Sequence, residues 1–188
     1  MFWKAICDNL GTIIGVVGSI LGGVVGWWLN NLSRKGKLSI FAGNGINGEF
    51  QAQDECEATS IENSETFGYK IFLEIYNSSA DTKLIRDIKV VFYSGKEILL
   101  THIPYDKALR VSNGSYLPQT HKTVQLFNIQ AKSAIKLELY GWIHKEDLEK
   151  VYKSNMVFLY YKDENNKQQT KLIETKDYKN YEFCKGEE

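Results

Sequence analysis

Paired cysteines are missing from this chain, which has only Cys7, Cys56 and Cys184 among its 188 residues. The three thiols lie far apart and no C-x-x-C pair occurs, so neither a zinc knuckle nor a dithiol redox motif is supported. Three unpaired cysteines are the simplest interpretation, and they favour a reducing compartment for Cys56 and Cys184.

An excess of either charge is also missing, because 23 Lys and Arg residues balance 23 Asp and Glu residues. A general nucleic-acid-binding protein has a basic excess or a basic stripe on its surface. We therefore expect no nucleic acid among the partners of this chain.

Motifs that carry catalysis or bind cofactors are equally scarce. His102, His121 and His144 are isolated from one another and lie in no metal-ligand or nucleophile motif. The stretch 163–174 begins with carboxylate and amide side chains at a calcium-loop spacing, but Gln168 stands where such a loop needs glycine. The sequence therefore predicts no metal, no cofactor and no catalytic set.

The glycine-rich string GNGING at 43–48 matches the dinucleotide-binding pattern G-x-G-x-x-G only as letters. That pattern works where a helix begins at its end and aims amide groups at a pyrophosphate. Here a strand pattern, EFQAQ, follows, and no strand–helix–strand unit surrounds it. The string therefore predicts a hairpin turn between two strands.

One long uncharged run is present near the start of the chain. From Asn9 to Ser33 no residue is charged, and residues 10–29 are almost wholly apolar or small. As a helix this stretch is about 30 Å long, which is the thickness of the hydrocarbon core of a bilayer. The sequence predicts a membrane-spanning helix at 10–30 that is surrounded by lipid.

A cleavable signal peptide is the main alternative for this run. Signal peptides have a basic start, a shorter apolar run and small residues at the cleavage site. Here the run ends in Trp27 and Trp28, whose indole rings are typical of a membrane–water interface. We therefore predict a retained anchor, with Trp27 and Trp28 at one interface.

Basic residues flank the predicted helix unequally. Lys4, beside Asp8, is the only basic residue before it, whereas Arg34, Lys35 and Lys37 follow it. The positive-inside rule then places the short N-terminal segment outside and the rest of the chain in the cytoplasm, with the helix in the cell (inner) membrane. The three basic residues after the helix are expected to anchor it at the cytoplasmic interface.

Glycine is frequent in the predicted helix, although it is the poorest helix former after proline. At about 100° per residue, five of the glycines fall within one narrow sector, and three polar residues lie along its edge. In lipid, small residues at this spacing let two helix backbones approach closely, which predicts homo-oligomerisation. The predicted oligomerisation face consists of Gly11, Gly15, Gly18, Ser19, Gly22 and Gly26, and a possible pore edge of Thr12, Ser19 and Asn30.

After residue 37 the apolar residues alternate with polar ones, as in strands with one buried face. Only 144–152 has a helical pattern, with Glu146 placed to pair with Lys150 and Glu149 with Lys153. Short strands at this spacing predict an all-β sandwich or barrel of about eight or nine strands with one short helix, preceded by a single transmembrane α-helix. The strand candidates are 37–43, 48–53, 67–77, 85–95, 96–103, 122–130, 133–143, 155–163 and 169–175.

Two segments lack a regular pattern. Residues 49–65 carry six acidic residues and no basic one, which indicates a mobile acidic loop that is either a solvated surface or a binding arm. Residues 104–118 form a long link between the two prolines of the chain, either a plain connector or a possible binding loop with Tyr105, Arg110 and Tyr116.

The sequence thus divides into five parts. They are a short extracytoplasmic N-terminus (1–9), the glycine-rich helix (10–30), a basic juxtamembrane linker (31–37), a cytoplasmic β-domain (38–175) and a C-terminal tail (176–188).

Three functional classes are compatible with this organisation. The first is a non-enzymatic protein that homo-oligomerises in the membrane and whose β-domain binds a cytoplasmic protein or small ligand, in one form a membrane-permeabilising effector of a bacterial or phage-defence system. The second is a membrane-tethered adaptor or scaffold that recruits partners through the β-domain. The third is an enzyme whose site is assembled from distant residues, although no cluster in the sequence supports it.

Overall fold

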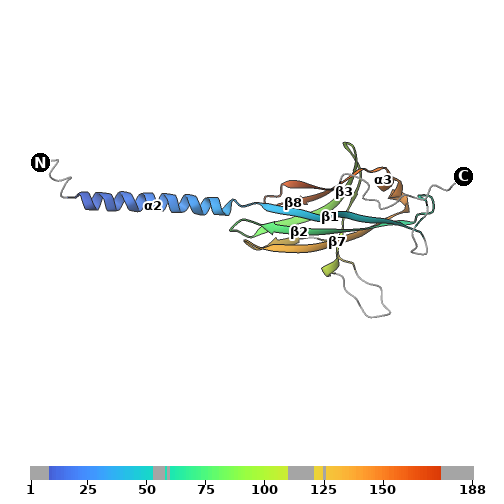
Figure 1. Cartoon of the computed structure of the whole chain (residues 1–188), viewed down its shortest axis with the longest axis horizontal. Coiled ribbons are helices and arrows are strands. Elements are labelled where there is room, and N and C mark those ends of the chain that lie inside the picture. The colour runs from blue at the N-terminus through green and yellow to red at the C-terminus, as the bar shows by residue number, and fades with distance from the viewer. Residues whose placement is uncertain (1–8, 53–57, 59, 110–120, 125, 175–188) are drawn as a thin grey trace.

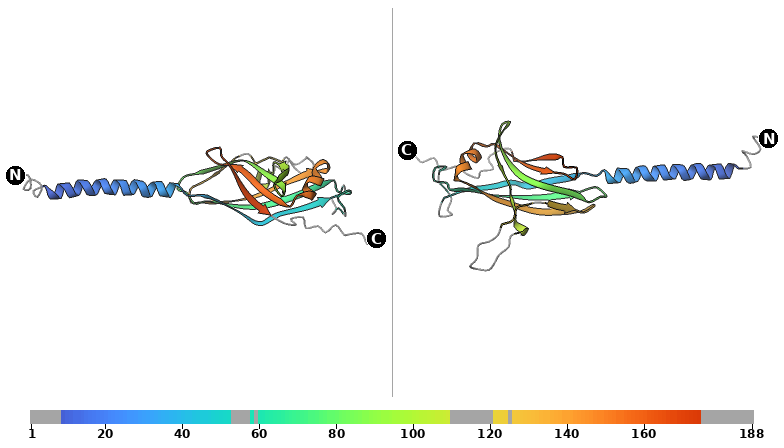
Figure 2. Two further views of the ribbon diagram at one scale, coloured as in Figure 1. Left: turned by 90° about the horizontal axis from the view of Figure 1, so that it is seen from above. Right: turned by 180° about the vertical axis from the view of Figure 1, so that it is seen from behind.

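The computed structural model describes residues 9–52, 58, 60–109, 121–124 and 126–174. One long helix, α2 (Leu10–Arg34), projects from one end of a two-layered β-domain, and the strands of the nearer layer run along roughly the same axis (Figure 1). Figure 2 shows the same elongated arrangement from two further sides.

The helix α2 is regular over 25 residues. Its stretch Leu10–Leu32 is the one helix among the described residues that is long and apolar enough to cross a membrane. None of this stretch is buried within the chain, and at about 1.5 Å per residue it is about 35 Å long. Unlike the helix of a folded core, α2 therefore leaves its whole apolar surface uncovered.

The β-domain is a sandwich of two antiparallel sheets, which decides between the two architectures that the sequence left open. The four-stranded sheet has the order β1 (Leu38–Gln51), β2 (Thr66–Asn77), β7 (Ala134–His144), β5 (Tyr105–Asp106). The five-stranded sheet has the order β4 (Glu97–His102), β3 (Lys83–Ser94), β8 (Met156–Lys162), β9 (Gln168–Glu174), with β6 (Leu126–Ile129) also paired to β3. The predicted all-β fold with nine strands is confirmed over the described residues.

The core lies between the inner faces of the two sheets. In β2 every second residue is buried, so that the alternate residues from Phe67 to Ile75 point inward and those that alternate with them, such as Phe72, point outward. Phe67 contacts Phe50 of β1 and Phe92 of β3, with ring centroids 4.8 Å and 6.5 Å apart, so aromatic rings join the two sheets. The alternating pattern therefore predicts which residues form the core.

The short helix predicted at 144–152 is confirmed as a 3-10 turn, η2 (Lys145–Asp147), followed by α3 (Leu148–Lys153), at the end of the sandwich away from α2 (Figure 1). Of the two predicted ion pairs, Lys153 and Glu149 are 2.6 Å apart, as expected. Lys150 instead pairs with Asp147, at 2.6 Å.

The hairpin turn predicted at 43–48 is wrong. This stretch lies inside the single strand β1, which pairs with β2 on both sides of a bulge between Ala42 and Ile46. Gly45 has φ +66°, a conformation that side chains disfavour, and it turns the strand at the bulge. Glycine supplies the same conformation to a hairpin, but here the continuous partner β2 keeps the chain in one strand.

The link predicted at 104–118 begins with structure of its own. Tyr105 and Asp106 form β5 against β7, and η1 (Lys107–Leu109) follows. The rest of this link lies outside the described residues, and so do residues 53–57 and 59 of the acidic segment 49–65, whose first three residues belong to β1.

The sandwich should fold without α2, because no residue of α2 contributes to the core. A chain starting at residue 37 and ending at 175 is expected to be soluble and monomeric. Its far-ultraviolet circular dichroism should be that of a β-protein, with a cooperative urea transition. A spectrum dominated by helix, or a non-cooperative transition, would contradict this fold.

Candidate functional site

Two regions of the molecule combine polar and apolar groups outside the hydrophobic core, and they are the candidate functional sites. One is the joint between α2 and the sandwich. The other is the outer face, by which we mean the side of the four-stranded sheet that is turned away from the five-stranded sheet.

The joint starts with a close contact between the residues after α2 and the β2–β3 turn. The backbone N–H of Lys37 donates to Ser78 Oγ at 2.8 Å, and the Ser78 N–H donates to the Lys37 carbonyl at 3.0 Å. A Cβ on Gly36 would lie only 2.3–2.4 Å from the backbone of Ser78 and Ser79. Gly36 therefore lets the chain pass directly against the turn.

A buried asparagine holds that turn in place. The Asn77 side chain is fully buried, and its Nδ2 lies 2.8 Å from the Asp81 carbonyl and 3.0 Å from the carbonyls of Ile129 and Gln130. Its Oδ1 accepts hydrogen bonds from the N–H and hydroxyl of Ser79, at 2.9 and 2.6 Å. One amide thus bonds to backbone groups of two separate turns and holds the turns together.

An exposed ion pair completes the joint. Arg34 Nε lies 3.2 Å from Asp81 Oδ1, with the two side chains 58% and 48% exposed. At that exposure the pair contributes at most about 1 kcal/mol. The orientation of α2 on the sandwich therefore depends mainly on the hydrogen bonds of Lys37 and the packing of Gly36.

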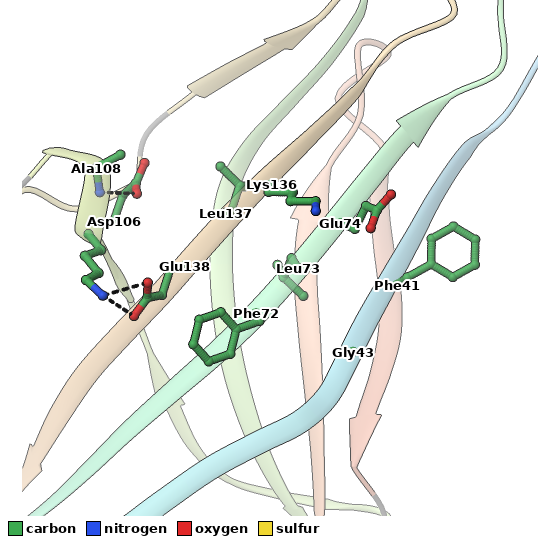
Figure 3. A pocket seen from close by; sticks show the side chains of 11 residues that line it. Phe41, Gly43, Phe72, Leu73, Glu74, Asp106, Ala108, Lys136, Leu137 and Glu138 are labelled. Atoms are coloured by element: carbon green, nitrogen blue, oxygen red, sulfur yellow. Dashed lines mark hydrogen bonds and ion pairs between the residues drawn. The ribbon is translucent and has the colours of Figure 1, made fainter.

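The outer face is hollowed near its middle. An open cavity of about 600 Å³ lies among β1, β2, β7 and η1. Two phenyl rings on it, Phe41 of β1 and Phe72 of β2, are 57% and 46% exposed, which is unusual for a sheet that covers a core. Figure 3 shows both rings beside the cavity, with the strands of the other sheet behind.

Charges of both signs surround these rings. Lys107 of η1 donates to both carboxylate oxygens of Glu138, each at 2.8 Å. Glu74 and Lys136 occupy neighbouring register positions on β2 and β7. The hollow is therefore apolar at its centre, and its lining also holds three carboxylates and two ammonium groups, those of Glu74, Asp106, Glu138, Lys107 and Lys136.

An aromatic cluster, formed by Tyr105, His121, Tyr140 and Trp142, borders the outer face on β5 and β7. The ring centroids of His121 and Trp142 are 5.0 Å apart, and those of Tyr140 and Trp142 are 5.3 Å apart. His121 Nδ1 lies 2.7 Å from the Tyr140 hydroxyl. At these separations the rings pack against one another, so that the cluster is a wall and not a cage for a ligand.

A second, half-buried histidine links the two sheets. The Tyr69 hydroxyl lies 2.6 Å from His102 Nδ1. Burial raises the pKa of the Tyr69 hydroxyl well above its usual value, so that the phenol stays protonated and donates a hydrogen bond to His102. Burial also lowers the pKa of His102, which keeps the imidazole neutral and able to accept at Nδ1. This pair therefore acts as a tie between the sheets.

The residues of the predicted glycine face are all exposed on α2. A Cβ on Gly11, Gly18 or Gly22 would meet nothing within 4 Å, and the same holds for the other glycines of the face. The Ser19 hydroxyl donates to the carbonyl of Gly15 at 2.8 Å, and so it is satisfied within the helix. The oligomerisation face stays a prediction. Also exposed are Thr12, Asn30, Trp27 and Trp28.

The other predicted residues are only partly brought together. Lys37 lies in the joint, and Tyr105 lies in the aromatic cluster. Arg110 and Tyr116 lie outside the described residues. Within the part of the chain that the structure describes, no three His, Cys, Asp or Glu side chains are grouped to hold a metal ion.

Sequence reasoning missed the hollow and the joint. Phe72 stands between Lys70 and Glu74 in the polar phase of β2, and this misplaced phenyl ring was a usable signal. Asn77 and Gly36 gave no signal, because their partners are distant in the sequence.

This geometry is that of an immunoglobulin-like β-sandwich joined to an N-terminal apolar helix. Residues 45–174 match the model of the YopI Ig-like domain, and the chain belongs to that family. The SPbeta prophage-derived uncharacterized protein YopI of Bacillus subtilis (strain 168) is 25% identical over 171 residues, which cover 85% of this chain and 94% of that protein.

Solved structures resemble this chain only loosely. An ApaA protein from Bordetella pertussis is 6% identical, with a TM-score of 0.34 over 73% of this chain and 89% of that one. The lipoprotein ycdA from Bacillus subtilis is 13% identical, with a TM-score of 0.36 over 76% of this chain and 39% of that one. No conclusion about this chain rests on either likeness.

The joint predicts a stability effect at Asn77. Asn77→Ala removes the side-chain donor to the buried carbonyl of Ile129 and the acceptor of the Ser79 N–H. At about 1–3 kcal/mol for each buried group left without its partner, the change should lower the free energy of unfolding by roughly 2–4 kcal/mol. Urea denaturation of the 37–175 domain measures it. The matched control is Asn128→Ala on β6, where the side chain is exposed and a change within about 0.5 kcal/mol is expected. Equal effects of the two variants would contradict a special role of Asn77.

Proposed function

We propose that this chain is a non-enzymatic, single-pass membrane protein that self-associates through the glycine face of α2 and presents its Ig-like domain to a partner. The observation that carries the proposal is the open sector of α2 on which five glycines lie. They leave the helix backbone bare along one side, and no residue that the structure describes covers it. In lipid, such a surface is best covered by the backbone of a second helix.

The orientation follows from the charges at the end of α2. Arg34, Lys35 and Lys37 stand where the helix enters the joint, so the positive-inside rule favours a cytoplasmic domain below the inner membrane. The exposed rings of Trp27 and Trp28 fit the interface of the same leaflet.

The outer face is the recognition surface in this proposal. Its hollow offers apolar contact at Phe41 and Phe72, and the charges around it can fix the orientation of a partner. The hydrogen bonds at Lys37 and Asn77 make the joint stiff. Binding of a partner at the outer face can then change the position of α2, because the stiff joint passes the movement of the domain on to the helix.

In its more specific form, the protein is an effector that makes the membrane leak when its domain receives a signal. Support comes from the polar edge of Thr12, Ser19 and Asn30 beside the glycines, and from the relative that is described as prophage-derived. The second candidate is a membrane-tethered scaffold, in which the helix only anchors. The hollow on the outer face favours it, because a recruiting surface needs no pore.

Substitution of the glycine face tests the assembly. Gly18→Leu or Gly22→Leu inserts a branched side chain where two backbones should nearly touch, and each lost contact costs about 1–2 kcal/mol at most. We expect the oligomeric fraction of full-length protein to fall several-fold in native mass measurements from nanodiscs. Membrane insertion should survive, because leucine is more hydrophobic than glycine.

The matched control is Val17→Leu on the opposite side of α2, which should change little. Unchanged assembly in the Gly18 and Gly22 variants would refute the glycine interface. Dye measurements of membrane potential in overproducing cells separate the two candidates. Depolarisation by the wild type that Gly22→Leu abolishes supports the effector, and no depolarisation supports the scaffold.

The topology has its own test. Protease added to intact spheroplasts should leave the domain undigested, because it lies behind the membrane, and digestion should follow when detergent is added. A domain that is removed from outside without detergent would reverse the orientation.

A further inference from the structure

We propose that the partner of the outer face is a second copy of this chain, related by a two-fold axis along the membrane normal, with β2 of each copy facing β7 of the other. The inference rests on the proposed function in one respect only, the anchoring of both copies in one membrane. It adds a second interface, in the Ig-like domain, to the one proposed for α2.

The direction of the outer face makes a neighbouring copy its natural partner. The strands of the four-stranded sheet run along roughly the same axis as α2 (Figure 1). When α2 stands across a bilayer, the outer face is turned sideways, parallel to the membrane normal. Another copy that spans the same membrane in the same orientation approaches from that side.

The register between β2 and β7 makes the outer face complementary to itself. Successive outward-facing pairs of neighbours are Gly68 and Trp142, Lys70 and Tyr140, Phe72 and Glu138, Glu74 and Lys136, and Tyr76 and Ala134. A two-fold axis that runs between the two strands exchanges their positions. Each residue of one copy then faces its own register neighbour from the other copy.

The facing residues suit each other in charge and in size. Glu74 faces the partner's Lys136, and the symmetric contact repeats the pairing, so that unlike charges meet twice. Bulky side chains face small ones at both ends, where Trp142 meets glycine and Tyr76 meets alanine.

The hollow of each copy receives the phenyl ring of Phe41 that protrudes from the other copy. Because β1 and η1 flank β2 and β7, the same axis brings Phe41 of one copy beside η1 of the other. There Phe41 meets Lys107 and Ala108, the residues of η1 that line the hollow. A ligand of one charge sign has no such match, since the margin of the hollow carries both signs.

The size of the outer face explains why the pairing needs the membrane. Four strands at about 4.8 Å spacing and ten residues at about 3.3 Å rise give a face of roughly 600 Å². Stable complexes in solution bury about 800 Å² per partner. The pairing is therefore weak between free domains and becomes favourable when anchors raise the local concentration.

Cysteine cross-linking between two tagged copies in native membranes tests the geometry. The native cysteines are replaced by serine in the full-length chain. One copy then carries Tyr76→Cys, and the other copy carries Ala134→Cys. Oxidation should join the two tags. The matched control pair, Glu97→Cys with Lys171→Cys on the exposed surface of the other sheet, should give no such adduct.

A charge swap separates pairing between copies from stability within one. Glu74→Lys with Lys136→Glu in the same chain keeps unlike charges on neighbouring strands, so the fold is preserved. Two swapped copies should cross-link as the wild type does. A swapped copy with a wild-type copy sets like charges against each other twice, and the adduct should fall roughly tenfold.

Equal adduct in matched and mixed charge backgrounds would overturn the proposal. The absence of adduct, in a protein that native mass measurements still show as an oligomer, would overturn it as well. The outer face would then bind another protein or an apolar small molecule. The two proposals can also fail separately. If Gly22→Leu leaves both the assembly and the adduct unchanged, the glycine interface is refuted and the outer-face pairing stands.

Discussion

A single buried amide holds together the turns against which the helix and the sandwich are joined. The side chain of Asn77 satisfies backbone groups in the β2–β3 turn and in the turn before β7, and it does so inside the protein, where an unmet carbonyl is costly. The next residue, Ser78, holds Lys37 at the start of β1. The direction of α2 therefore depends on the contacts of Lys37 and Gly36 with a turn that this asparagine holds in place.

The sequence predicted the parts of this structure that local patterning controls. Alternation in β2 placed Phe67, Ile71 and Ile75 inward, and the uncharged run predicted α2. The stretch 43–48 failed because a glycine with positive φ serves a hairpin and a bulge equally well. Whether the chain turns back there is decided by the pairing of β1 with β2, which is not visible in the six residues themselves.

The candidate site was predictable only where a residue departed from the pattern around it. Phe72 between Lys70 and Glu74 is such a departure, and so is glycine in an apolar helix. The partners of Asn77 at Ile129 and Gln130 are more than fifty residues away, and Phe41 and Glu138 come from different strands. No spacing rule relates residues that meet only after two turns and three strands have packed.

The joint also determines how two weak interfaces can act together. Helices that pack through glycines and faces of roughly 600 Å² each bind weakly on their own. When both belong to one rigid chain, formation of the first pair holds the second at a high effective concentration. A long flexible linker would lower that concentration, since it lets the domains point in any direction. With only residues 35–37 between α2 and β1, and with Gly36 packed against the backbone of Ser78, little of that gain is lost. In the effector that we propose, a change in the pairing of the domains would alter the angle between the helices.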